Sequence, residues 1–280
     1  MILAKRIGAL AEVGLVLALF LYLRIVLSDS GFSAWQGPML GAALLSSCLL
    51  FFILPLTFVL IGGRDPGACG LVTENLEYHW RVAVRAIGFV LPATVLFPVI
   101  AGLGSNHQEW LGASILTVGF VVGGVLFAKK SRDLAPGPEA QLAWAGLWVY
   151  VALLVIGLIV SYLLHPLSPL ATRVVAVLVF VAFLEEFFFR GYVQSRLNDC
   201  FGKPFTFQGV EFGAGLLLAA AAFGLFHPLT VADGTPWPWA LWTTAGGLVF
   251  GLLREKTGAV TAPALLHGAI MLPAVLFGTS

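Results

Sequence analysis

The 280-residue chain is short of charged residues and of cysteine, and both shortages exclude familiar classes of protein. Charged residues make up 10% of the sequence, against about 25% in soluble globular domains, which excludes an ordinary soluble fold. Cys48, Cys69 and Cys200 form neither a CxxC motif nor a pattern with histidine, so we expect no disulfide framework and no metal site built on them. The net charge of +1 is uninformative as a total, because in a membrane protein the positions of the charges matter. Nothing in the sequence indicates a nucleic-acid partner, and we expect no cofactor.

Hydrophobic residues, by contrast, make up 59% of the chain, and the mean hydropathy is +0.97. These values predict an all-α, polytopic integral membrane protein. A helix of about 17 to 25 apolar residues crosses a hydrocarbon core of about 30 Å, and nine segments come close to that length, the seventh and eighth being short. We therefore expect about 8–9 transmembrane helices. The candidate spans are residues 7–27, 38–61, 84–103, 111–128, 142–164, 172–192, 213–227, 239–253 and 259–277.

The basic residues favour one orientation of these spans, because cytoplasmic loops carry an excess of lysine and arginine. If the N-terminus is inside, thirteen of the fifteen basic residues fall at cytoplasmic ends, and only Arg24 and Arg173 are left outside. This favours an N-in, C-out chain of nine spans over an even count. The thirteen are Lys5, Arg6, Arg64, Arg81, Arg85, Lys129, Lys130, Arg132, Arg190, Arg196, Lys203, Arg254 and Lys256.

A polar linker divides the chain into two regions. Residues 129–140 contain the sequence KKSRD and then Pro136, Gly137 and Pro138, through which a helix would not continue. We therefore interpret residues 1–135 as an N-terminal transmembrane region of unknown role. Residues 136–280 form a second transmembrane region, which holds the chemically interesting side chains.

Two adjacent acids, Glu185 and Glu186, lie at the end of an apolar run that otherwise predicts a membrane-spanning helix. Two ionisable residues at that depth cost about 5 to 7 kcal/mol before any partner is found, so we expect them to serve a function. Residues four apart are neighbours on a helix surface, which lets Glu186 pair with Arg190. Glu185 projects about 100° away, which leaves its carboxylate to face a cavity as a general base.

Two histidines follow in apolar segments downstream. His227 closes the seventh span in the sequence FGLFH, and His267 lies within the ninth in the sequence TAPALLHGAIM. A histidine inside a membrane span either forms part of a functional site or makes a hydrogen bond between packed helices. Two of them in separate helices, beside the acidic pair, favour a functional site.

Together these motifs resemble the CPBP family of CAAX prenyl proteases and bacteriocin-processing enzymes, also called Abi proteins. The resemblance covers about residues 172–277 and implies a glutamate-type intramembrane endopeptidase, a hydrolase acting on a membrane-associated peptide or protein. It implies that Glu185 activates water, that His227 holds that water and that His267 stabilises the oxyanion. Glu186 and Arg190 would then fix the catalytic helix. The resemblance also implies that residues 136–280 are a CPBP-like catalytic core, and we expect the inner membrane of a prokaryotic cell.

One position departs from the family pattern. Members usually have Asn or Asp four residues after the last histidine, whereas this chain has Met271, whose thioether cannot donate a hydrogen bond. The sequence therefore also allows a non-catalytic CPBP-like scaffold or immunity protein. It does not indicate an oligomeric state.

Two further alternatives use the same side chains in other ways. Glu185, His227 and His267 could form a metal hydrolase site, although a compact motif such as HExxH is missing. A membrane transporter could use the buried Glu and His residues to relay protons, although paired glycine-broken helices are not evident. Of the other acids, Glu12 is interpreted as a helix-end residue, whereas Glu211 is close enough to the seventh span to reach the site.

The predicted spans also raise a question of depth. Glu185 lies one to two turns above the cytoplasmic edge, while His227 ends a helix that leads away from that edge, and the two must meet. Either residues 198–211 re-enter the membrane, or the sixth helix continues past Gln194 and places Glu185 nearer the middle.

Overall fold

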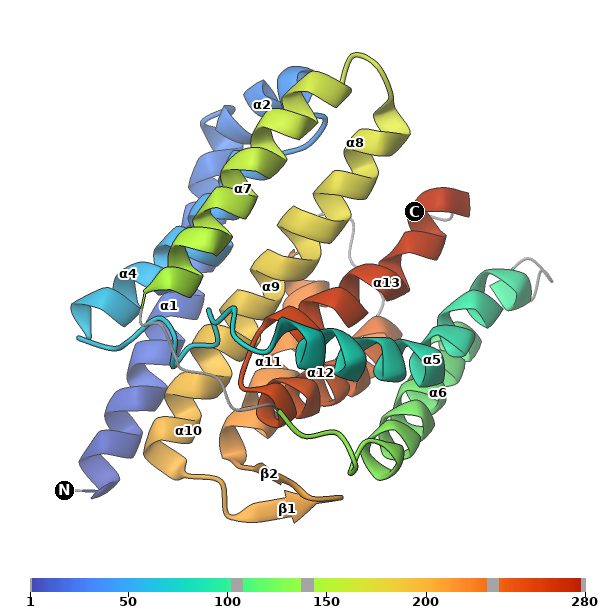
Figure 1. Ribbon diagram of the computed structural model, residues 1–280. Helices are drawn as coiled ribbons and strands as arrows, with labels where there is room; N and C mark the ends of the chain where they lie inside the picture. Colours follow the sequence, from blue (N-terminus) through green and yellow to red (C-terminus); the bar gives the residue numbers. More distant parts are fainter. Residues whose placement is uncertain (1, 102–107, 137–143, 231–236, 278–280) are drawn as a thin grey trace.

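Each of the nine predicted segments is largely helical over the residues that the computed structural model describes, which are 2–101, 108–136, 144–230 and 237–277. Among these residues, four helices are long and apolar enough to cross a membrane: residues 3–29, 44–61, 110–130 and 145–164. Two shorter apolar helices occupy residues 214–229 and 261–276. The chain is thus an all-α, polytopic membrane protein with one short β-hairpin (Figure 1).

The N-terminal half contains α1 (Ile2–Asp29), α2 (Phe32–Leu40), the continuous run α3 (Leu44–Ser47), η1 (Cys48–Ile53) and α4 (Leu54–Ile61), then α5 (Leu76–Ala101) and α6 (Gln108–Lys130). The C-terminal half contains α7 (Ala145–Leu164), the continuous run α8 (Pro169–Val175), η2 (Ala176–Phe183), α9 (Leu184–Glu186), η3 (Phe187–Gln194) and α10 (Ser195–Phe201), then β1 (Phe205–Phe207), β2 (Val210–Phe212), α11 (Ala214–Thr230), α12 (Trp237–Thr257) and α13 (Thr261–Phe277). Segments labelled η are π-helical.

The second predicted span begins later than its hydropathy suggests. The predicted span starts at residue 38, but α2 ends at Leu40 and the spanning helix begins at Leu44. Gly41 makes the break, because its φ of +75° suits glycine and a Cβ there would lie 2.8 Å from the Thr172 side chain. Hydropathy misses this turn because both sides of it are apolar.

The sixth predicted span, 172–192, is part of a longer helix that runs from α8 through α10 (Figure 1). Ser168 caps its start by accepting a hydrogen bond from the Ala171 backbone N–H at 3.2 Å, and Pro169 follows at the first helical position. The helix ends only at Phe201, and the hairpin β1–β2 takes up most of the remaining polar segment. The extended helix therefore answers the question of depth, because Glu185 lies near its middle.

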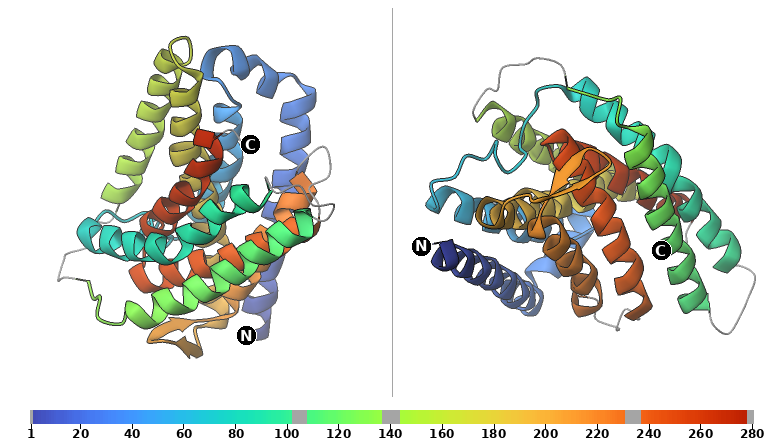
Figure 2. Two further views of the ribbon diagram at one scale, coloured as in Figure 1. Left: turned by 90° about the vertical axis from the view of Figure 1, so that its right-hand side faces the viewer. Right: turned by 90° about the horizontal axis from the view of Figure 1, so that it is seen from below.

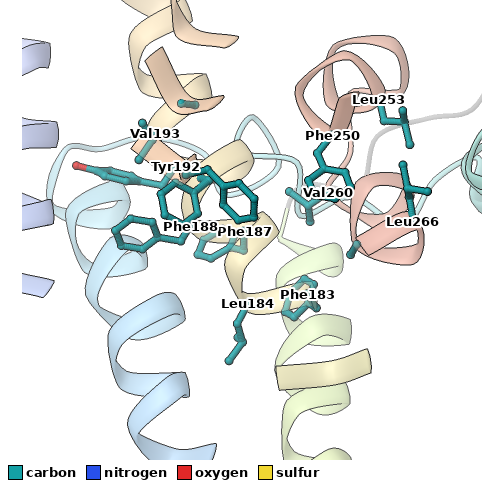
Figure 3. Packing of buried hydrophobic residues seen from close by; sticks show 14 of the residues in the cluster. Phe183, Leu184, Phe187, Phe188, Tyr192, Val193, Phe250, Leu253, Val260 and Leu266 are labelled. Carbon is teal, nitrogen blue, oxygen red and sulfur yellow. The ribbon is translucent and has the colours of Figure 1, made fainter. Parts of the chain in front are cut away.

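Aromatic side chains pack the long helix against the N-terminal helices. Phe188 meets the rings of Phe20 from α1 and Phe51 from η1 edge to face, with centroids 5.3 and 5.7 Å apart. Figure 3 shows the same helix filling the space between the 44–61 helix and the α12–α13 pair. In a bilayer such contacts stabilise mainly through close packing, because lipid is as apolar as the side chains.

On the opposite side of the molecule, α5 and α6 cover α12 and α13 (Figure 2). The segment between α4 and α5 is also tied to the C-terminal half. Arg254 donates a hydrogen bond to the Ala68 carbonyl oxygen at 2.9 Å, and the Val260 N–H donates to the Gly70 carbonyl at 3.0 Å. The regions on either side of the 129–140 linker therefore pack together, and residues 137–140 of that linker lie outside the described residues.

Candidate functional site

Three of the five candidate residues line one small cavity among the C-terminal helices. Glu185 from α9, His227 from α11 and His267 from α13 border a space of about 150 Å³. Met271, one turn after His267, lines the same space. The other lining residues are Val181, Phe223, Trp239, Trp242, Thr243, Gly246, Phe250 and Ile270.

The remaining two candidates, Glu186 and Arg190, lie behind this cavity as a buried ion pair. Both side chains are 0% exposed, and the Arg190 Nε atom is 3.2 Å from Oε2 of Glu186. The pairing expected from their spacing is therefore present. Glu186 also contacts the Nδ1 atom of His267 through Oε1, at 2.9 Å. One carboxylate thus connects the long helix to α13.

Aromatic rings and a backbone carbonyl complete the surroundings of Arg190. Its guanidinium lies 4.3 Å from the ring centroid of Phe223 and 5.1 Å from that of Phe250, both within cation–π range. Its Nη2 atom donates to the Gly247 carbonyl oxygen at 3.4 Å. The charge is therefore enclosed by the long helix, α11 and α12, and it holds the three together.

Glu185 differs from Glu186 in its surroundings, because it forms no ion pair among the described residues. It lines the cavity, and its Oε2 atom is buried without a hydrogen-bond partner among the described residues. The short α-helical stretch that carries both acids lies between two π-helical segments, η2 and η3, and such segments often occur at functional sites. The carboxylate of Glu185 is thus the one available to accept a proton.

His227 is held in one tautomer by its own helix. Its Nδ1 atom lies 2.8 Å from the carbonyl oxygen of Phe223, and a carbonyl can only accept, so Nδ1 carries the proton. In the neutral ring, Nε2 then has a lone pair and is an acceptor. This arrangement suits a side chain that receives a hydrogen bond from water.

His267 is oriented by two neighbours. Its Nδ1 atom donates to Glu186, and its ring stacks on Phe250 with centroids 5.0 Å apart and an interplanar angle of 17°. With Nδ1–H used in this way, Nε2 donates a hydrogen bond only when the ring is an imidazolium. His267 can therefore stabilise a negative charge in its charged form alone.

The wall formed by α12 was not anticipated from the sequence. Trp239, Trp242, Thr243, Gly246 and Phe250 all line the cavity, at helical spacings of three, four, seven and eleven from the first. That spacing places them on one face of α12, which is the signal that a sequence reading could have used. Because the face is almost entirely apolar, it is indistinguishable from an ordinary packing face.

Two acids outside the main motif behave differently from expectation. Glu12 is more than the helix-end residue we expected, because it binds Arg64 at 2.5 Å and Arg196 at 2.7 Å and accepts a hydrogen bond from the Tyr192 hydroxyl at 3.1 Å. It joins α1 to the C-terminal part of the long helix. Glu211 does not reach the cavity, since it lies exposed on β2 opposite Thr206.

The metal site considered from the sequence is not formed by these side chains. Across residues 2–101, 108–136, 144–230 and 237–277, no group of three or more His, Cys, Asp or Glu residues has an arrangement that could hold a metal ion. His267 uses its Nδ1 atom for Glu186 instead.

Comparison with known protein families finds a match, and it covers the candidate site. Residues 166–272 match the family described as type II CAAX prenyl endopeptidase, Rce1-like. All five candidate residues and Met271 fall within that range, and the match confirms the family resemblance drawn from the motifs. No curated protein and no solved structure matches the chain.

Proposed function

We propose that the chain, which carries an Rce1-like type II CAAX prenyl endopeptidase domain at residues 166–272, is an intramembrane endopeptidase that hydrolyses a peptide bond of a membrane-associated protein or peptide. One observation supports this most directly. Of two adjacent acids, Glu186 is neutralised by Arg190, whereas Glu185 lines a cavity together with His227 and His267. Glu186 is thus the positioning carboxylate and Glu185 the reacting one.

In the proposed reaction, a water molecule binds between the Glu185 carboxylate and Nε2 of His227. Glu185 takes a proton from the water as its oxygen attacks the scissile carbonyl carbon, and the carbonyl π electrons move to the oxygen. The imidazolium of His267 donates to that oxyanion, an interaction typically worth about 3 to 4 kcal/mol of the barrier. When the C–N bond breaks, the proton passes from Glu185 to the departing amine.

The orientation of the chain is part of the same proposal. Nine spans with the N-terminus inside and the C-terminus outside, in the inner membrane of a prokaryotic cell, account for the distribution of basic residues. In that orientation the lower end of the long helix, with Arg196 and the hairpin, faces the cytoplasm (Figure 1).

A cell-based processing experiment tests the activity. Wild type, Glu185→Gln, His227→Ala and the exposed control Glu211→Gln are each co-expressed with candidate membrane-tethered substrates, and the products are identified by mass spectrometry. We expect cleavage by wild type and the control only. Identical products from all four, with each protein shown to be folded and inserted, would favour a non-catalytic scaffold, a function that Met271 supports.

A further inference from the structure

The proposed oxyanion site lacks a second side-chain donor at the expected position. Oxyanion holes usually present more than one preorganised donor, and the loss of one costs about 10² to 10³ in rate. Here Met271 lies one turn beyond His267 on the cavity wall and cannot donate. His267 itself donates from Nε2 only as an imidazolium, because its Nδ1 is engaged by Glu186.

We infer that the indole N–H of Trp242 is this second donor and binds the oxyanion formed during peptide hydrolysis, an inference that rests on the proposed function. Trp242 lines the cavity, and its Nε1 atom is buried without a hydrogen-bond partner among the described residues. A buried donor left unpaired destabilises the folded state, and such groups in native structures call for an explanation. A transient acceptor in the cavity provides one.

Two other donors that border the cavity, Thr243 and His227, already have acceptors. The Thr243 hydroxyl donates to the Trp239 carbonyl oxygen at 2.7 Å, and Nδ1 of His227 donates to the carbonyl of Phe223. Trp242 differs from these because its Nε1–H has no acceptor among the described residues. It also differs from His267, because an indole N–H donates at every pH at which the protein is folded.

Packing holds the indole ring in a fixed position. The Trp242 ring lies 5.9 Å from the ring centroid of Phe120 on α6 and 5.6 Å from that of Trp239. It shares one face of α12 with Gly246 and Phe250, and Phe250 in turn stacks on His267. The donor is therefore preorganised by the helix that also supports the histidine, as electrostatic stabilisation of a transition state requires.

Proton and electron transfer remain as in the proposed reaction. The water oxygen bonds to the carbonyl carbon, Glu185 holds the proton, and the indole keeps its own proton while its hydrogen bond to the oxyanion shortens. Trp242 thus contributes no proton to the products. Its effect falls on the rate of the chemical step and leaves substrate binding largely unchanged.

The test compares Trp242→Phe with wild type in membranes, using a substrate identified by the processing experiment. Phenylalanine keeps an aromatic ring and removes the N–H. We expect kcat to fall about 100-fold with KM within about twofold. Trp237→Phe is the matched control, because Trp237 starts the same helix, is 62% exposed and does not line the cavity.

A rescue variant separates a donor from a merely structural ring. Adding Met271→Asn to Trp242→Phe places an amide donor on the cavity wall one turn after His267. We expect kcat of the double variant to be about 10-fold or more above that of Trp242→Phe. Unchanged kcat in Trp242→Phe, or a loss that Met271→Asn does not recover, would overturn the inference while wild-type cleavage stands. Absence of cleavage by wild type would instead reject the proposed function, and the inference with it.

Discussion

The two adjacent acids give the sharpest prediction, because the same substitution should lower stability at one position and catalysis at the other. Glu186→Gln keeps the shape of the side chain but leaves the fully buried Arg190 without its counter-ion. Removing one partner of a buried pair costs about 3 to 5 kcal/mol. At about 2 to 4 °C per kcal/mol for a large domain, the melting temperature should fall by about 6 to 20 °C.

Glu185→Gln should leave the melting temperature within about 2 °C of wild type, because the Glu185 carboxylate has no ion pair among the described residues. The Glu185→Gln substitution should instead lower the rate of cleavage, because loss of a general base costs about 10² to 10⁴-fold in rate. The assay heats the detergent-solubilised protein to a series of temperatures. Size-exclusion chromatography then measures the folded fraction that remains at each temperature. Equal melting temperatures for the two variants would refute the assignment of the buried role to Glu186.

A charge-balanced double variant extends the same measurement. Glu186→Gln combined with Arg190→Met removes both charges, so no uncompensated ion remains in the interior. We expect it to recover at least half of the loss seen in Glu186→Gln. A double variant less stable than the single one would show that Arg190 is held chiefly by the rings of Phe223 and Phe250.

Three further predictions follow from single features. Gly224→Ala should destabilise the protein and abolish cleavage, because a Cβ there would lie 1.8 Å from the Thr244 Oγ1 atom on α12. The control Gly88→Ala, on the exposed face of α5, should be neutral or slightly stabilising in the same assays. Burial raises the pKa of Cys69 to about 11, so little thiolate is present at pH 8. Alkylation of Cys69 by a maleimide, measured as a mass shift, should therefore be slow at pH 8 and become faster as the pH rises towards 11. Cleavage should survive strong chelators, and a loss that added zinc reverses would contradict the glutamate-based mechanism.

Local features of the site were predictable from the sequence. The pairing of Glu186 with Arg190 and the separate direction of Glu185 follow from helix geometry alone. The apolar segments are likewise helical as predicted, because their length and composition can be read from each short stretch of sequence alone. The exception at Gly41 arises where two helices meet without any change in hydropathy.

Contacts between distant segments were not predictable. Glu12 binds Arg196 across 184 positions, and nothing near either residue indicates the other. The α12 wall is hidden for a different reason, since an aromatic face that lines a cavity has the same spacing as one that packs in a core. Hydropathy also does not determine the length of the sixth helix, because its polar continuation to Phe201 lies beyond the apolar stretch.

The summed charge of the enclosed site is the same before and during the proposed chemical step. With His267 as an imidazolium, the charges of Glu185, Glu186, Arg190 and His267 sum to zero, which keeps down the desolvation cost of a buried cluster. When Glu185 takes a proton from water, the cluster becomes positive as the oxyanion becomes negative. The total therefore remains zero through the chemical step, and each hydrogen bond to the oxyanion acts within surroundings of low dielectric constant. A neutral donor such as the Trp242 indole suits this balance, because it strengthens binding of the oxyanion without adding a charge to the resting site.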